Sequence, residues 1–340
     1  MLKEAIEEKR KTKCESAGDK MPLITNSSFS GNKYYRGKHI ETILPALFRQ
    51  VLITYTRERI ELTDGDFLDL DWQKQNASKL VLLFHGLEGS SSSNYIKGFA
   101  THFFALGWDV CAVNFRSCSG EMNKFLRSYH SGATEDIDEV INHVLRFTQY
   151  QKITTIGFSL GGNILLKYLG EKKYTLPSAL HSAIAFSVPI DLAASAIEMT
   201  KWQNTIYMNR FLKTLKQKVQ LKANQFPKTI NPANIERITT FYEFDSYFTG
   251  PIHGFIDAQD YYDKNNALRF LPRITIPTLL VNAQNDPFLT RSCFPTQLAK
   301  NHPFLYFEQP QYGGHVGFSL ELPTGKYWSE QRAAAFIQSV

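Results

Sequence analysis

The chain of 340 residues contains only four cysteines, Cys14, Cys111, Cys118 and Cys293, and no two of them have the C-x-x-C spacing of a metal or redox site. Such a low density does not build a disulfide framework, so we expect reduced thiols in a cytoplasmic protein. No apolar run approaches the roughly 20 residues that span a bilayer, and the charged N-terminus lacks the apolar stretch of a signal peptide. Membrane spanning and export are therefore not expected.

Motifs for bound cofactors are missing as well. No cluster of Cys, His and Asp has metal-ligand spacing, and no glycine loop matches a dinucleotide-binding or P-loop pattern. We therefore expect no metal and no cofactor. The formal net charge is +6, but no recognised nucleic-acid motif accompanies it, so we expect no nucleic-acid partner.

The charges that are present gather in two segments. Residues 1–20 carry 11 charged side chains and little to bury, which predicts a disordered extension. Residues 199–235 contain seven basic residues and no acid, a pattern that favours a solvated helix face over attraction to anionic lipids or substrates. The seven are Lys201, Arg210, Lys213, Lys216, Lys218, Lys222 and Lys228.

The rest of the chain has an alternating α/β pattern. An Asp-Gly turn at residues 63–66 joins two β-rich runs, 51–62 and 67–72, as an antiparallel hairpin. Short apolar runs then alternate with helical segments, which predicts a mostly parallel central sheet flanked by helices. The expected strands are 80–84, 110–115, 153–156, 183–186, 278–283 and 305–307, and the expected helices are 95–106, 135–147 behind a possible Thr134 cap, 160–169 and 327–338.

The strand rhythm stops between residues 189 and 265, where helical stretches rich in aromatic residues take over. We interpret 189–265 as an inserted helical cap between the first part of the core, 21–188, and the second part, 266–340. Aromatic side chains over an active site would form an apolar acyl pocket.

Residues 157–161 read G-F-S-L-G and match G-x-S-x-G, the pattern of a sharp strand-to-helix turn that exposes a nucleophilic serine. The expected strand 153–156 precedes it and an amphipathic helix follows. Ser159 is the candidate nucleophile, and Gly157 and Gly161 avoid side-chain collisions across the turn.

A serine hydroxyl needs a base, and the base needs an orienting acid. In sheets with this turn the partners follow in the chain order Ser, acid, His, on loops after strands. His315, in a glycine-rich loop after the last expected strand, is preferred to His302, which precedes that strand. Asp286 follows strand 278–283 and is the first choice of acid, while Asp191, after the preceding strand, stays open as the alternative.

A tetrahedral oxyanion needs preorganised donors. One should be the N–H of Leu160, directly after the serine. The second is expected from the HGLEG loop at residues 85–89, with the Leu87 N–H as donor. His85 is expected to brace this loop, and Glu88 is interpreted as a solvated or structural carboxylate.

Taken together, these blocks resemble the YheT-like branch of the α/β-hydrolases, the AB hydrolase 4 family. The resemblance implies an α/β-hydrolase fold and a carboxylic-ester hydrolase with Ser159, Asp286 and His315 as its charge relay, and it lowers the weight of Asp191. The matching blocks are RGKHIETI at 36–43, LTDGDF at 62–67, FHGLEGS at 84–90, FRSCSGE at 115–121, GFSLGGN at 157–163, NDPF at 285–288 and GGHVGF at 313–318.

The predicted function is that of a serine esterase that cleaves a small-molecule or lipid ester with a short or medium acyl chain through an acyl-enzyme. An acyltransferase that uses the same intermediate is the nearest alternative, because only the acceptor differs. A non-catalytic binding module would be expected to lack a triad member, and all three are present.

Overall fold

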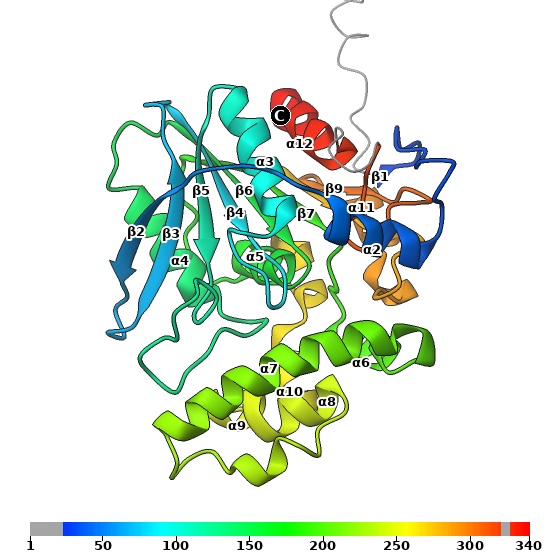
Figure 1. Cartoon of the computed structure of the whole chain (residues 1–340). Coiled ribbons are helices and arrows are strands. Elements are labelled where there is room, and N and C mark those ends of the chain that lie inside the picture. The colour runs from blue at the N-terminus through cyan, green and yellow to red at the C-terminus, as the bar shows by residue number, and fades with distance from the viewer. Residues whose placement is uncertain (1–22, 321–326) are drawn as a thin grey trace, which may run out of the picture.

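The computed structural model describes residues 23–320 and 327–340, so the predicted extension 1–20 lies outside the described residues. Its centre is one nine-stranded sheet in the order β1-β9-β8-β7-β6-β4-β5-β3-β2 (Figure 1). The strands are β1 (Leu23–Ile24), β2 (Thr56–Glu61), β3 (Phe67–Gln73), β4 (Lys79–Phe84), β5 (Asp109–Asn114), β6 (Lys152–Phe158), β7 (Leu180–Phe186), β8 (Thr278–Val281) and β9 (Leu305–Glu308).

The predicted α/β architecture is confirmed. β2 and β3 form the antiparallel hairpin, with Glu61 opposite Phe67, and β3 pairs antiparallel with β5. Every other neighbouring pair is parallel. The expected start of the first run at residue 51 was wrong, because β2 begins only at Thr56.

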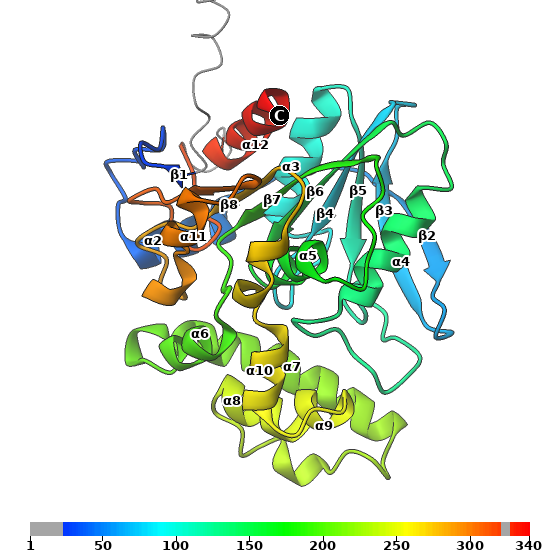
Figure 2. The same cartoon turned by 180° about the vertical axis from the view of Figure 1, so that it is seen from behind.

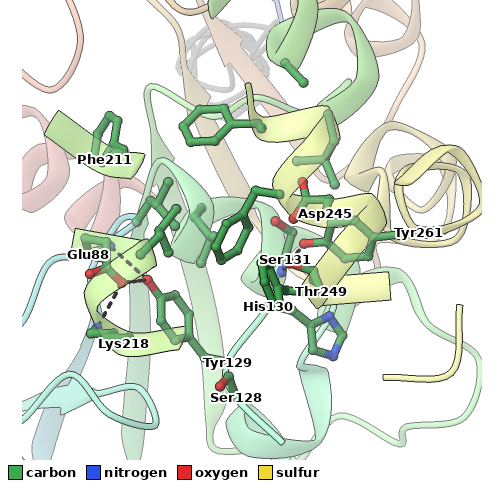
Figure 3. A pocket seen from close by; sticks show the side chains of 18 of the residues that line it. Glu88, Ser128, Tyr129, His130, Ser131, Phe211, Lys218, Asp245, Thr249 and Tyr261 are labelled. Carbon is green, nitrogen blue, oxygen red and sulfur yellow. Dashed lines mark hydrogen bonds and ion pairs between the residues drawn. The ribbon is translucent and has the colours of Figure 1, made fainter. Parts of the chain in front are cut away.

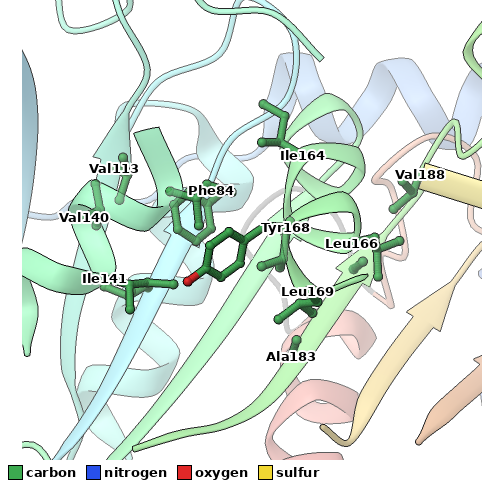
Figure 4. Packing of buried hydrophobic residues seen from close by; sticks show 14 of the residues in the cluster. Phe84, Val113, Val140, Ile141, Ile164, Leu166, Tyr168, Leu169, Ala183 and Val188 are labelled. Atoms are coloured by element: carbon green, nitrogen blue, oxygen red, sulfur yellow. The ribbon is translucent and has the colours of Figure 1, made fainter. Parts of the chain in front are cut away.

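Helices cover both faces of the sheet, and alternate strand residues point to one face or the other. On one face, Leu82 and its alternate neighbours pack with α4 (Thr134–Val144) and α5 (Leu160–Gly170), around the fully buried Tyr168 (Figure 4). On the other face, Val81 and Leu83 pack with α3 (Asn94–Ala105) and α12 (Trp328–Ser339). Continuous apolar strands are therefore needed, since both sides of each central strand are buried.

One helix start differs from the prediction. Thr134 is the first residue of α4 and its side chain makes no cap; the N-cap residue is Ala133. The Thr134 hydroxyl instead donates to the Glu171 carboxylate at 2.6 Å. The local sequence pattern predicts that the Thr134 hydroxyl caps the helix, but the Glu171 carboxylate, 37 residues further along the chain, binds that hydroxyl.

Between β7 and β8 the described chain contains helices and no strand of the sheet. These helices gather beyond the sheet edge at which the parallel strands end (Figures 1 and 2). Division of the chain into core and cap at residues 189 and 265 stays a prediction. Apart from four short 3-10 helices, the helices between β7 and β8 are α6 (Leu192–Met199), α7 (Thr205–Gln225), α8 (Phe241–Phe244), the π-helical turn η3 (Asp245–Thr249), α9 (Gly250–Ile252) and α10 (Ala258–Asn265).

Two further helices flank the sheet near β9. They are α2 (Lys38–Phe48), which precedes the hairpin, and α11 (Thr296–Lys300), between β8 and β9. Within residues 23–320 and 327–340, no helix combines the length and the apolar character needed to traverse a bilayer.

Candidate active site

Ser159 lies at the sharp turn between β6 and α5, as the motif predicts. Its backbone has φ 50° and ψ −120°, a strained conformation for a residue with a side chain. A methyl group at Gly157 would lie 2.7 Å from the Gly162 Cα, and one at Gly161 would lie 2.3 Å from the His85 carbonyl oxygen. Both glycines are therefore required by close backbone approach.

Three side chains from distant parts of the sequence meet at this turn. The His315 Nε2 lies 3.0 Å from the Ser159 Oγ, and the His315 Nδ1 lies 2.9 Å from the Asp286 Oδ2. The other carboxylate oxygen of Asp286 accepts from the Phe288 N–H at 2.9 Å. An imidazole whose Nδ1–H donates to the carboxylate leaves its Nε2 lone pair for the serine proton.

The alternatives considered for these roles lie elsewhere. Asp191 is the N-cap of α6 and accepts from the Ala194 N–H at 3.2 Å. The His302 Nδ1 accepts from the Leu305 N–H at 2.9 Å, at the start of β9. Asp191 therefore caps the start of a helix, and His302 binds the backbone at the start of a strand. Among the described residues, neither side chain forms a hydrogen bond with Ser159.

The loop after β4 passes beside Ser159, since a methyl group at Gly86 would lie 3.1 Å from the Ser159 Cβ. The Gly86 carbonyl oxygen accepts from the Gly89 N–H at 3.0 Å and lies 2.7 Å from the His85 Nδ1. The Gly86 carbonyl and the Leu87 N–H belong to the same peptide group. Because the C=O and N–H of a trans peptide point in opposite directions, the Leu87 N–H points away from Gly89 and the His85 ring. Among the described residues, the N–H groups of Leu87 and Leu160 have no hydrogen-bond acceptor.

His85 is fully buried and holds two strands' ends together. Its Nε2 accepts from the Phe115 N–H at 3.1 Å, which leaves the Nδ1–H to donate to the Gly86 oxygen. Burial lowers the pKa of His85 to about 4, so the ring is neutral near pH 7. The expected bracing interaction is present.

Glu88 follows Leu87 in the left-handed region, with φ 54°. The Tyr129 hydroxyl accepts from the Glu88 N–H at 2.9 Å and donates to its carboxylate at 2.6 Å. Lys218, from α7, forms an ion pair with the same carboxylate at 2.8 Å (Figure 3). The Glu88 side chain is only 7% exposed. Glu88 is thus a structural carboxylate with a cation from the helical region as its partner.

The solvated helix face predicted for residues 199–235 was therefore wrong at two positions. Lys218 reaches Glu88, and Lys222, buried to 2% exposure, donates to the carbonyl oxygens of Asn123 and Phe125. Burial lowers the pKa of Lys222 to about 8. Sequence alone did not identify these partners because they lie 97 to 130 residues away in the chain.

The loop that carries His315 is held by α2, a contribution that the sequence analysis did not assign. The His315 N–H donates to the Thr42 Oγ1 at 2.9 Å, and the Gly314 N–H donates to the Asn285 Oδ1 at 3.0 Å. The Asn285 amide in turn donates to the Glu41 carboxylate at 2.5 Å. In the sequence, the only indication that Glu41 and Thr42 contribute to the site was their presence in the RGKHIETI block.

Arg116, in the loop after β5, is also buried and structural. It forms ion pairs with Asp64 at 2.8 Å, Asp66 at 3.1 Å and Asp136 at 2.8 Å. These contacts tie the loop after β5 to the β2–β3 turn and to α4.

A mainly apolar cavity of about 170 Å³ opens onto Ser159 and His315. Its walls combine the sheet edge with α6 to α10, and aromatic residues are frequent in them. Figure 3 shows Glu88 and Lys218 on one side of the cavity and Asp245 with Tyr261 on the other. The apolar lining includes Leu87, Leu160, Leu192, Ala196, Met199, Phe211, Leu215, Val219, Ile230, Phe241, Phe244, Phe248, Ile252 and Phe288.

The sheet order, the serine at a strand-to-helix turn and the order of its partners define an α/β hydrolase. The family model described as alpha/beta hydrolase fold matches residues 79–320. The chain therefore belongs to the α/β-hydrolase family.

Within that family the chain belongs to the YheT-like branch. It is 37% identical over 308 residues to the Escherichia coli protein named "Putative esterase YheT", covering 88% of this chain and 89% of that protein. It is 30% identical over 310 residues to "Phospholipase ABHD3" of Bos taurus, covering 88% and 75%. The esterase Pf2001 of Pyrococcus furiosus has the same fold, with a TM-score of 0.58 over 86% of this chain and 96% of that one, at 16% identity.

Proposed function

We propose that this protein is a carboxylic-ester hydrolase with Ser159 as nucleophile, His315 as general base and acid, and Asp286 as the orienting acid. The observation that carries the proposal is the continuous hydrogen-bonded chain from the Ser159 Oγ through both ring nitrogens of His315 to Asp286, at 3.0 and 2.9 Å. Relatives named as a putative esterase and a phospholipase support the same class of reaction.

In the proposed mechanism His315 takes the Ser159 proton as the oxygen attacks the ester carbonyl. Asp286, whose side chain is fully buried, stabilises the imidazolium that forms. The N–H groups of Leu87 and Leu160 donate to the oxyanion, aided by the positive end of the α5 dipole. His315 then protonates the leaving alcohol. In the second half of the reaction a water molecule attacks the acyl carbonyl and gives a proton to His315, which returns it to the Ser159 Oγ as the carboxylic acid is released.

We infer that the acyl chain occupies the apolar cavity under α6 to α10. The lining of this cavity is mainly apolar and rich in aromatic side chains, which suits an acyl chain, and we propose one of short or medium length. Lipid esters with such chains are included in the proposed substrate class.

Fluorophosphonate labelling tests the nucleophile. Wild-type protein should be labelled at Ser159, and Ser159→Ala should not, while both melt at similar temperatures. A series of nitrophenyl esters from acetate to palmitate should give its highest kcat/KM at short or medium length. Equal labelling of wild type and Ser159→Ala would refute the proposal. Addition of an alcohol acceptor separates hydrolysis from acyl transfer by the products formed.

A further inference from the structure

The Glu88 carboxylate presents an electrostatic problem that the proposed mechanism does not solve. Glu88 directly follows Leu87, whose N–H is the proposed oxyanion donor, and both residues line the cavity with Ser159. A negative charge beside the oxyanion opposes the negative charge that develops in the transition state. The charge of Glu88 in this cavity must therefore be neutralised if it is not to slow the reaction.

Within the described part of the chain, one cation lies at this carboxylate. Lys218 places its ammonium group 2.8 Å from the Glu88 Oε1, and its side chain is 25% exposed. The same ammonium lies 5.4 Å from the centre of the Tyr129 ring and 3.3 Å from the Cys118 Sγ. Cys118 does not add a second negative charge, because burial raises the pKa of its thiol to about 11.

The carboxylate also fixes the backbone beside the oxyanion donor. Its contact with the Tyr129 hydroxyl, which in turn accepts from the Glu88 N–H, closes a small ring of hydrogen bonds. That ring holds Glu88 in its left-handed conformation, and the Gly86 carbonyl anchors the other end of the loop. Glu88 therefore gives the loop its shape, at the cost of a charge in the cavity that Ser159 also lines.

We propose that Lys218 is a positioning residue for catalysis: the helical region supplies it to neutralise Glu88, so that the oxyanion loop keeps its shape without opposing the oxyanion. This inference rests on the proposed esterase function. It also makes the position of α7 a condition for activity, because α7 carries the ammonium group that neutralises Glu88.

The experiment compares two substitutions that remove the same ion pair. Lys218→Met leaves an uncompensated carboxylate and should lower kcat for a nitrophenyl ester by on the order of tenfold, with little change in KM. Glu88→Gln removes the charge but keeps a polar side chain for Tyr129, and should cost less than about threefold. The double variant Glu88→Gln/Lys218→Met should recover most of the kcat that Lys218→Met loses.

Controls separate charge from packing. Lys213→Met makes the same substitution on an exposed position of α7 and should match wild type. Lys218→Arg keeps the charge and should retain activity within about threefold. Thermal melting checks that each variant is folded, and if Lys218→Met does not fold, Lys218→Gln takes its place in the same comparison, because it also removes the charge beside an intact Glu88.

Equal losses in Lys218→Met and Glu88→Gln would overturn the inference, since a purely structural ion pair predicts that result. A double variant as slow as Lys218→Met, or Lys218→Met as active as Lys213→Met, would also overturn it. Wild-type protein that neither hydrolyses esters nor reacts with a fluorophosphonate would instead refute the proposed function itself.

Discussion

Replacement of Asp286 by Asn tests the acid of the triad with almost no change of shape. The Asp286 side chain is fully buried and joins the His315 Nδ1 at 2.9 Å. An Asn amide group at that position can donate to Nδ1, which would place the ring proton on Nε2, facing the Ser159 Oγ. In that tautomer His315 cannot accept the serine proton.

The magnitude follows from the lost charge. A carboxylate and an imidazolium with centres about 4 Å apart interact by about 4 kcal/mol at an effective dielectric constant near 20. Since 1.36 kcal/mol corresponds to a tenfold change in rate, kcat/KM should fall by about 10³-fold or slightly more. The melting temperature should change much less, because the side chain keeps its volume.

Asp191→Asn is the matched control. Asn caps a helix about as well as Asp, so the α6 cap at Ala194 should survive and kcat/KM should stay within about twofold of wild type. The assay is nitrophenyl ester hydrolysis at saturating and limiting substrate. An Asp286→Asn variant within tenfold of wild type, or a large loss in Asp191→Asn, would refute the assignment of the acid.

Three other predictions concern the surroundings of the site. Thr42→Val removes the acceptor of the His315 N–H and should lower kcat about five- to tenfold, as expected for one hydrogen bond of about 1 kcal/mol, and kcat unchanged within error would contradict this. Gly317→Ala would place a methyl group 2.1 Å from the Glu41 carbonyl oxygen, so both activity and melting temperature should fall together. Buried His85, with its pKa lowered from 6.5 to about 4, contributes stability that is present above pH 6.5 and is lost as the pH falls towards 4. That loss is about 2 kcal/mol at pH 5, and denaturant unfolding of wild type and His85→Gln should show a flatter pH dependence in the variant.

The strand-to-helix turn could be predicted from the sequence because its causes are local. Gly157, Ser159 and Gly161 lie within five residues, and the strand and helix around them have strong hydrophobic patterns. Asp286 and His315 followed from topology, since parallel strands bring the loops after them to one edge of the sheet. The structure places all three side chains in one hydrogen-bonded chain.

The parts that could not be predicted depend on contacts between distant segments. Lys218 was expected to face solvent because a helix rich in lysine usually does, and only the fold brings it to Glu88, 130 residues away. Thr42 and Glu41 belong to a helix with no catalytic pattern of its own. Thr134 has the residue type of a cap, but a carboxylate on another element binds its hydroxyl.

The support of the His315 loop by α2 has a practical consequence for anyone who shortens this protein. The family match begins at residue 79, and a chain trimmed to that boundary would retain Ser159, Asp286 and His315. It would lose Thr42 and Glu41, together with the three strands β1, β2 and β3 of the sheet. Such a fragment would carry every residue of the motif and still lack the scaffold that aims the imidazole, so the smallest working unit of this enzyme is larger than the region by which it is recognised.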